Sequence, residues 1–327
     1  MVLLIAAGVV LVTGTLLDVY VTTISMRGAG PFSSRVMKGM WRPAASSTRL
    51  SHRGLEIYGS LVLPATILLW SAALYVGWTL VFLADPDAVV SATTGAPAEW
   101  WERAYFTGYT ISTLGNGELR PGGVVWQAFT VVASVSGLLI ITLAITYVTP
   151  VMSAVVAKRR VARMVVGLGA TPADMLENGW DGQTFQRLSS QLTGLSPALA
   201  ELAQQHMAYP VLHYFHSAER GTALAPAMAV LDDMLTLMRF GVDPEHRLDA
   251  VTLNTTVAAF DVLLTALHAA HIDPADEVPA PPALAVLDRL DIPRVADEQY
   301  GAHVDGLTQR RALLLGFVHS DGWTWDV

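Results

Sequence analysis

Residues 110–121 read TISTLGNGELRP, a short polar stretch with two glycines that separates two long apolar runs. The run before it, Ile57–Ala84, contains no charged residue, and the run after it, Val124–Ala157, extends for 34 residues without one. A third run, Val2–Ile24, carries a single charge at Asp18. Because about 20 apolar residues cross a hydrocarbon layer of ~30 Å as a helix, the sequence predicts three membrane-spanning helices.

The composition is typical of a membrane protein with an additional soluble part, since 52% of the residues are hydrophobic and only 15% are charged. Residues 1–160 carry 11 Lys and Arg against 7 Asp and Glu, whereas residues 161–327 carry 9 against 21. The acidic second half argues against a nucleic-acid partner. The absence of cysteine excludes disulfides and Cys-ligated metals. No P-loop, dinucleotide-binding fingerprint or catalytic triad is recognisable, so we do not expect an enzyme.

The charges of the loops predict the orientation, because Lys and Arg gather on the cytoplasmic side of a membrane. The loop after the first run has no acidic residue from Val19 to Leu55. Its basic residues are Arg27, Arg35, Lys38, Arg42, Arg49 and Arg53. The segment Asp85–Pro121 is mainly acidic, and basic residues return at 158–160 and 163. We therefore expect a multi-pass plasma-membrane protein with an external N-terminus and a cytoplasmic C-terminal half.

The segment Glu99–Thr113, EWWERAYFTGYTIST, is expected to dip into the membrane and return. It would form about four helical turns, which is too short to cross a bilayer. Non-helical backbone at membrane depth is tolerated only where it is buried in protein or lines a water-filled path. The glycine-containing residues that follow should therefore lie in such a place.

These residues, Thr113-Leu114-Gly115-Asn116-Gly117 with Glu118, resemble the Thr-x-Gly-Tyr/Phe-Gly-Asp filter of the potassium channel family. The resemblance extends over Ile57–Ala157, roughly a third of the chain, and the competing interpretation is an ordinary hairpin loop. The resemblance implies a bacterial-type subunit that consists of an outer helix, a pore helix, a filter and an inner helix, with an extra N-terminal helix. Four copies of this subunit would form one pore. Its ion ligands would be the backbone carbonyls of residues 113–116 and the hydroxyl of Thr113. Alternating glycines allow positive φ, which lets successive carbonyls point at the pore axis.

Two residues depart from the family pattern. Asn116 stands where selective members carry Tyr or Phe, whose ring packs behind the filter and holds its diameter. A pore that passes both sodium and potassium is therefore the alternative to a potassium channel. Glu118 replaces the usual Asp and would keep a ring of carboxylates at the outer mouth, which raises the local cation concentration.

The third apolar run contains candidate cavity and gate residues. Gly137 lies 22 residues beyond Gly115, a spacing similar to that of the family's hinge glycine, although close helix packing explains a glycine equally well. Thr142, Thr146 and Thr149 follow at steps of four and three and share one helical face. That face either lines a wet cavity or makes hydrogen bonds between helices.

The first run and the basic loop offer two further candidates. Asp18 is an intramembrane acid and therefore a functional candidate, with a salt bridge to the basic loop as the plainer interpretation. Arg35, Lys38 and Arg42 are spaced as on one face of a helix, which would lie on anionic lipid or only anchor the topology. No span contains the arginine series of a voltage sensor.

The second half of the chain predicts a helical domain of short amphipathic helices, with helix starts at Ser196-Pro197 and Ala225-Pro226. His213 and His216 lie close together in the sequence. They are candidates for a pH-sensitive or metal-binding group, and ordinary structural histidines are the competing interpretation.

These observations favour an all-α membrane protein with four parts: an N-terminal transmembrane helix (1–25), a basic cytoplasmic linker (26–56), a pore domain (57–160) and a helical cytoplasmic domain (161–327). We expect a homotetrameric potassium channel gated at the inner helix by its cytoplasmic domain. Its partners would be monovalent cations, the lipid bilayer and other copies of the chain, with no cofactor besides the permeant ions. The alternatives are a mixed sodium and potassium pore and a non-conducting membrane-anchored sensor or scaffold.

Overall fold

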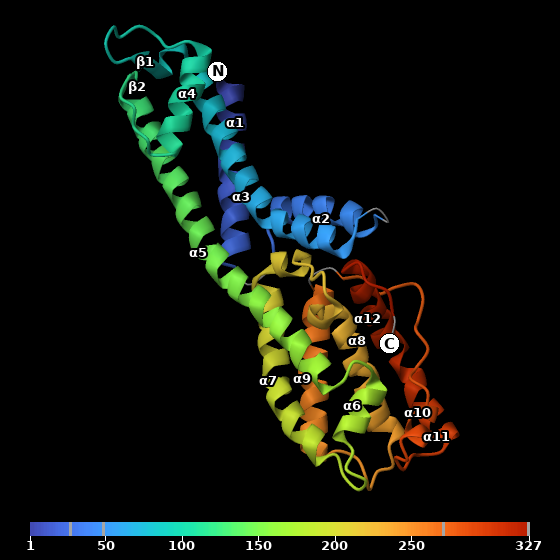
Figure 1. Ribbon diagram of the computed structural model, residues 1–327. Helices are drawn as coiled ribbons and strands as arrows, with labels where there is room; N and C mark the ends of the chain where they lie inside the picture. The colour runs from blue at the N-terminus through green and yellow to red at the C-terminus, as the bar shows by residue number, and fades with distance from the viewer. Residues whose placement is uncertain (26–27, 48–49, 270–271, 326–327) are drawn as a thin grey trace. The chain divides into compact units, whose positions relative to one another are not determined.

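The computed structural model describes residues 1–25, 28–47, 50–269 and 272–325. Two basic residues of the first loop, Arg27 and Arg49, lie outside this set. The described chain is mainly helical, with a single short two-stranded ribbon (Figure 1). The protein is therefore an all-α membrane protein, as the sequence predicts.

Two compact units make up the chain, and each is described by itself. The membrane unit comprises Met1–Lys38 and Leu61–Pro150, and the helical unit comprises Gly39–Ser60 and Val151–Val327. The helices α2 (Pro31–Ala45), α3 (His52–Leu83) and α5 (Val124–Leu168) each contribute residues to both units.

The membrane unit contains the three expected spans as α1 (Val2–Thr23), α3 and α5. α3 begins five residues before the apolar run that predicted it. α5 continues for 45 residues, a length of ~68 Å at 1.5 Å per residue, which is more than twice the hydrocarbon layer. α1 runs beside α3 (Figure 1), and a Cβ atom on Gly8 would lie 2.5 Å from the carbonyl oxygen of Gly77. Close packing through small residues is typical of membrane helices.

A short helix, α4 (Trp100–Ile111), occupies the expected pore-helix segment. Its start is fixed by a capping box between Glu99 and Glu102, in which each side chain accepts a hydrogen bond from the other residue's backbone amide. Its buried face joins an aromatic core, where the rings of Phe82 and Phe106 meet edge to face with centroids 5.2 Å apart. α4 is therefore held against α3 rather than free to span the membrane.

The helical unit contains a set of shorter helices around one buried helix. These are α6 (Pro172–Gly179), α7 (Gln186–Ala208), α8 (Leu224–Thr236), α9 (Ala250–Ala269), α10 (Ala285–Arg289), α11 (Asp297–Val304) and α12 (Thr308–Ser320). All 13 residues of α8 are buried, so α8 forms the centre of this unit. Its Asp233 accepts a 2.5 Å hydrogen bond from the Arg311 guanidinium of α12, which satisfies a charge inside the core.

Two features of the helical unit differ from the expectation. Pro197 lies inside α7 and does not start a helix, whereas Pro226 does lie in the first turn of α8. By length and composition α9 is a fourth helix, among those described, that is able to cross a membrane, whereas three were expected. Within this unit its buried apolar residues, such as Phe260 and Leu263, pack against neighbouring helices, while Val251 and Val262 are exposed.

Candidate functional site

The segment after α4 has a regular backbone alternation. Thr113, Gly115 and Gly117 have positive φ values of 59°, 61° and 77°. Positive φ is common for glycine and costs energy at threonine, so the strain at Thr113 points to a functional constraint. Residues 112–118, called the filter segment below, are all exposed in the single chain. The segment is therefore accessible to groups outside the single chain.

The two ends of the filter segment are fixed to the membrane unit. At its start, Leu114 N donates to the carbonyl oxygen of Tyr109 at 2.9 Å. After its end, β2 (Leu119–Pro121) pairs antiparallel with β1 (Val89–Ser91). The Tyr109 hydroxyl of α4 also donates to the Leu119 carbonyl at 3.0 Å, which ties the ribbon back to the helix. The exposed Glu118, the last residue of the filter segment, directly precedes this ribbon.

The Asn116 side chain reaches back to α4. Its Nδ2 donates to the hydroxyl oxygen of Tyr105 at 2.5 Å, and the Tyr105 ring packs edge to face on Tyr109. Tyr105 was not predicted as a functional residue, although its position four residues before Tyr109 places both rings on one face of α4. An amide–phenol hydrogen bond thus supports the segment at the position where the resemblance led us to expect an aromatic ring.

Gly137 lies where α5 crosses the end of α4. A Cβ atom there would lie 2.0 Å from the carbonyl oxygen of Ile111, so only glycine fits this crossing. This geometry supports the interpretation of Gly137 as a residue that allows close helix packing. α5 continues unbroken past this point, and the hinge stays a prediction.

The three threonines of α5 lie on an exposed face of the single chain. The Thr142 hydroxyl donates to the Leu138 carbonyl at 2.8 Å, and the Thr146 hydroxyl donates to the Thr142 carbonyl at 3.0 Å. These two hydroxyls are therefore satisfied within their own helix, with Thr149 one turn further on the same side. Their oxygens keep acceptor capacity toward the exposed side.

The side chain of Asp18, a residue of α1, is buried against the start of α2. Its carboxylate accepts hydrogen bonds from the backbone amides of Phe32 (2.8 Å) and Ser33 (3.1 Å), from the Ser33 hydroxyl, and from the indole nitrogen of Trp70 (3.2 Å). A carboxylate is favourable at a helix N-terminus because it accepts from the free amides there. No ion pair joins Asp18 to a basic side chain within the described ranges, so Asp18 holds α1, α2 and α3 together by capping instead of by the expected salt bridge.

His213 and His216 are buried in the helical unit rather than exposed to a ligand. His216 Nε2 lies 3.1 Å from His52 Nδ1, and His216 Nδ1 lies 3.6 Å from an Asp321 carboxylate oxygen. Burial, and after it the charge of Lys158, lower the pKa of His213 to about 4. In the part of the chain that the structure describes, no three His, Cys, Asp or Glu side chains are placed to hold a metal ion.

Lys158 completes this buried group. Its ammonium donates to the carbonyl oxygens of Phe215 (3.0 Å) and Leu212 (3.4 Å). Burial alone would raise the pKa of Asp321, but Lys158 and His216 outweigh it and hold that pKa below its usual value. From the sequence, Lys158 indicated only the membrane topology, because the chain segments that surround it are far apart in sequence.

Comparison with known proteins gives two matches. A family model described as "Ion channel" matches residues 66–154, which include α4 and the filter segment. The "Uncharacterized membrane protein YdjJ" of Bacillus subtilis (strain 168) is 32% identical to this chain over 324 residues, which cover 99% of this chain and 95% of that protein. No solved structure matches the chain.

Proposed function

This chain belongs to the family of the Bacillus subtilis membrane protein YdjJ and carries an ion channel domain, and on this basis we propose that it forms a cation channel that conducts potassium. The observation that carries the proposal is the alternation of positive φ at Thr113, Gly115 and Gly117. Such a backbone turns successive carbonyl oxygens toward one side, where they replace the hydration shell of a cation. The ligands are the carbonyls of residues 113–116 and the Thr113 hydroxyl.

The proposed channel is a homotetramer in the plasma membrane. The filter segment is exposed in one chain, and unsatisfied backbone groups at membrane depth each cost several kcal/mol. Several copies around a common axis remove this cost and form the pore. Glu118 then forms a ring of carboxylates at the outer mouth, and the exposed faces of Thr142, Thr146 and Thr149 line the cavity below.

Gating is assigned to α5. This helix runs without a break from the membrane unit, at Val124, into the helical unit, at Leu168. A change in the helical unit is thereby transmitted along one continuous helix to the cavity-lining face. In the proposed orientation the helical unit is cytoplasmic and responds to a cytoplasmic signal.

A mixed sodium and potassium pore is the second candidate, and Asn116 is the observation that favours it. A single hydrogen bond to Tyr105 supports the filter segment at this position, where a packed ring would restrict its diameter more strongly. A filter that can widen or relax discriminates less between the two ions.

The test is recording from purified protein in liposomes with potassium on one side and sodium on the other. A reversal potential near that of potassium supports the first candidate, and one near zero supports the mixed pore. Gly115→Ala places a side chain at φ 61° and should abolish or strongly reduce the current, whereas Gly123→Ala, which meets no atom within 4 Å, should leave it intact. Absence of any current from correctly assembled protein would contradict both candidates.

A further inference from the structure

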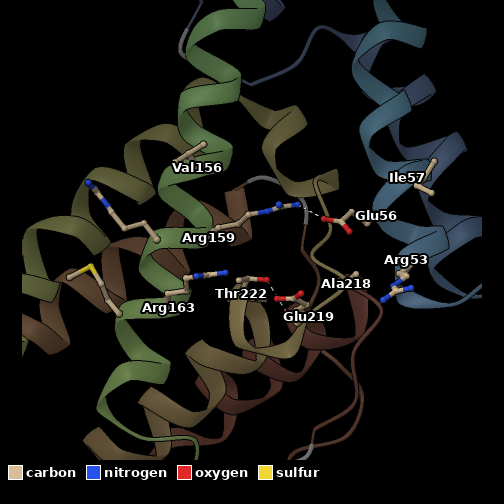
Figure 2. A pocket seen from close by; sticks show the side chains of 11 residues that line it. Arg53, Glu56, Ile57, Val156, Arg159, Arg163, Ala218, Glu219 and Thr222 are labelled. Atoms are coloured by element: carbon tan, nitrogen blue, oxygen red, sulfur yellow. Dashed lines mark hydrogen bonds and ion pairs between the residues drawn. The ribbon is translucent and has the colours of Figure 1, made fainter.

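The helical unit contains an open cleft of about 980 Å³ that the proposed conduction pathway does not use. Three segments form it: the start of α3, the end of α5 and residues 218–222 (Figure 2). Its charged lining residues are Arg53, Glu56, Arg159, Arg160, Arg163 and Glu219. The cleft is thus basic although residues 161–327 are strongly acidic overall.

Two of the four arginines are engaged by carboxylates. Arg159 makes a 2.5 Å ion pair with Glu56, and Arg160 makes a 3.4 Å ion pair with Glu201, which does not line the cleft. Arg53 and Arg163 are exposed, and neither has an acidic partner among the residues that the structure describes. Figure 2 shows Arg159 and Arg163 extending from α5 on one side and Arg53 at the start of α3 on the other. Two free guanidinium groups therefore border one space.

This arrangement is suited to a phosphate-bearing ligand. Guanidinium groups donate in a planar fork that matches phosphate oxygens, and the N-terminal turn of α3 adds partial positive charge at the same edge. Ile57 and Val156 supply an apolar wall for the organic part of a ligand. The volume lies at the upper end of the ~300–1,000 Å³ range of small-molecule sites.

We propose that this cleft binds a phosphate-bearing anion through Arg53 and Arg163, with Arg159 held beside them by Glu56. The ligand is either a free organic phosphate or the headgroup of an anionic lipid, because both present the same group. The proposal goes beyond ion conduction and does not depend on it, since binding is measurable on protein that carries no current. A bound anion would contact both the start of α3 and the end of α5. Its binding would therefore act on α5, the helix to which gating is assigned.

The experiment uses purified full-length protein and measures its thermal unfolding midpoint at constant ionic strength. ATP and inorganic pyrophosphate probe the free source in detergent, and nanodiscs with and without phosphatidylglycerol probe the lipid source. We expect a saturable rise of the midpoint with one source, and an apparent affinity weaker by about tenfold or more in Arg53→Gln and Arg163→Gln. Arg289→Gln, an exposed arginine outside the cleft, is the matched control and should behave as the unmodified protein.

A second measurement needs no variant and covers the case in which a substitution prevents folding. Phenylglyoxal modifies exposed arginines, and mass spectrometry locates the modified positions. ATP or phosphatidylglycerol should protect Arg53 and Arg163 but not Arg289. Equal modification at all three positions with every probe, or midpoint shifts that are the same in all variants, would overturn the proposal.

Discussion

The side chain of Asn116 decides how firmly the filter segment is held from behind. Its hydrogen bond to Tyr105 is the support that the structure gives the segment at this residue, and the Tyr105 ring is in turn packed on Tyr109. A hydrogen bond is directional but weaker than a buried ring, because its net contribution is about 0.5–1.5 kcal/mol. The selectivity of the proposed pore should therefore be sensitive to Tyr105.

Tyr105→Phe removes the acceptor of this hydrogen bond and keeps the ring. We expect the potassium to sodium permeability ratio to fall, by a factor of about 2 to 10, since roughly 0.5–1.5 kcal/mol of support for one filter conformation is lost. Reversal potentials in liposomes measure the ratio. Tyr20→Phe, which alters an exposed tyrosine of α1, is the control. An unchanged ratio in Tyr105→Phe would show that this hydrogen bond does not contribute to selectivity.

Asp18→Asn tests the cap at the start of α2. The amide keeps one acceptor oxygen but loses the charge that favours the helix N-terminus, so we expect the membrane unit to be destabilised by about 1–3 kcal/mol. Asp87→Asn alters an exposed acid of the same unit and should leave stability nearly unchanged. Thermal unfolding in detergent compares the two variants, and equal midpoints would show that the Asp18 carboxylate contributes nothing as a cap.

The residues of the candidate pathway were predictable to the extent that they form a local pattern. Residues 113–118 are contiguous, and positive φ at Gly115 and Gly117 follows from the residue type, whereas positive φ at Thr113 does not. The partners of Asp18, Ser33 and Trp70, lie 15 and 52 residues away in the sequence and could not be predicted. A single sequence gives the loop charges but not which amides a buried carboxylate meets.

At the scale of elements, the crossing of α4 and α5 positions the filter segment. The backbone of α5 at Gly137 touches the last carbonyl of α4 at Ile111, immediately before the filter segment begins. Any side chain at this crossing has to push the two helices apart. Small shifts there should change the pore while leaving the helices themselves intact.

Gly137→Ala and Gly167→Ala should therefore have opposite effects on stability, although both glycines lie in α5. At Gly137 the new Cβ meets the Ile111 oxygen at 2.0 Å, and we expect a loss of about 1–3 kcal/mol in stability together with reduced current. At Gly167 it meets no atom within 4 Å, and alanine should stabilise the helix by up to ~1 kcal/mol. Unfolding midpoints of the two variants measure the difference, and a stabilising Gly137→Ala would contradict the close crossing.

The sequence predicted elements well where one physical requirement dominates them. Membrane helices require long apolar runs, so α1, α3 and α5 were expected within a few residues of their starts. Pro197 was misread as a helix start because proline is disfavoured inside a helix, whereas the structure places it within α7. The ribbon of β1 and β2 is too short to give an alternating pattern.

At the scale of the whole molecule, stability should depend on pH through buried histidines of the helical unit. Burial and the charge of Lys158 lower the pKa of His206 to about 3 and that of His213 to about 4. An unfolded chain protonates histidine below about pH 6.5. Between pH 6.5 and the lowered pKa values of the folded state, the unfolded state binds more protons than the folded state. Stability is therefore complete above pH 6.5 and is lost as the pH falls.

Lowering the pH from 7 toward 4 should therefore destabilise the helical unit by about 1.4 kcal/mol per pH unit for each of these histidines below pH 6.5. Hydrogen exchange of the amides in α8, corrected for the pH dependence of intrinsic exchange, measures this opening free energy because α8 is the buried centre of the unit. His213→Phe keeps an apolar ring and should reduce the slope by about one proton, whereas His319→Phe, at an exposed position, should not change it. An unchanged slope in His213→Phe would mean that His213 binds no proton on unfolding. It would contradict the burial of His213 as the cause of its lowered pKa. The buried carboxylate of Asp321, whose pKa is lowered, acts in the same direction at lower pH, so the loss should continue below about pH 4, where the contribution of His213 ends.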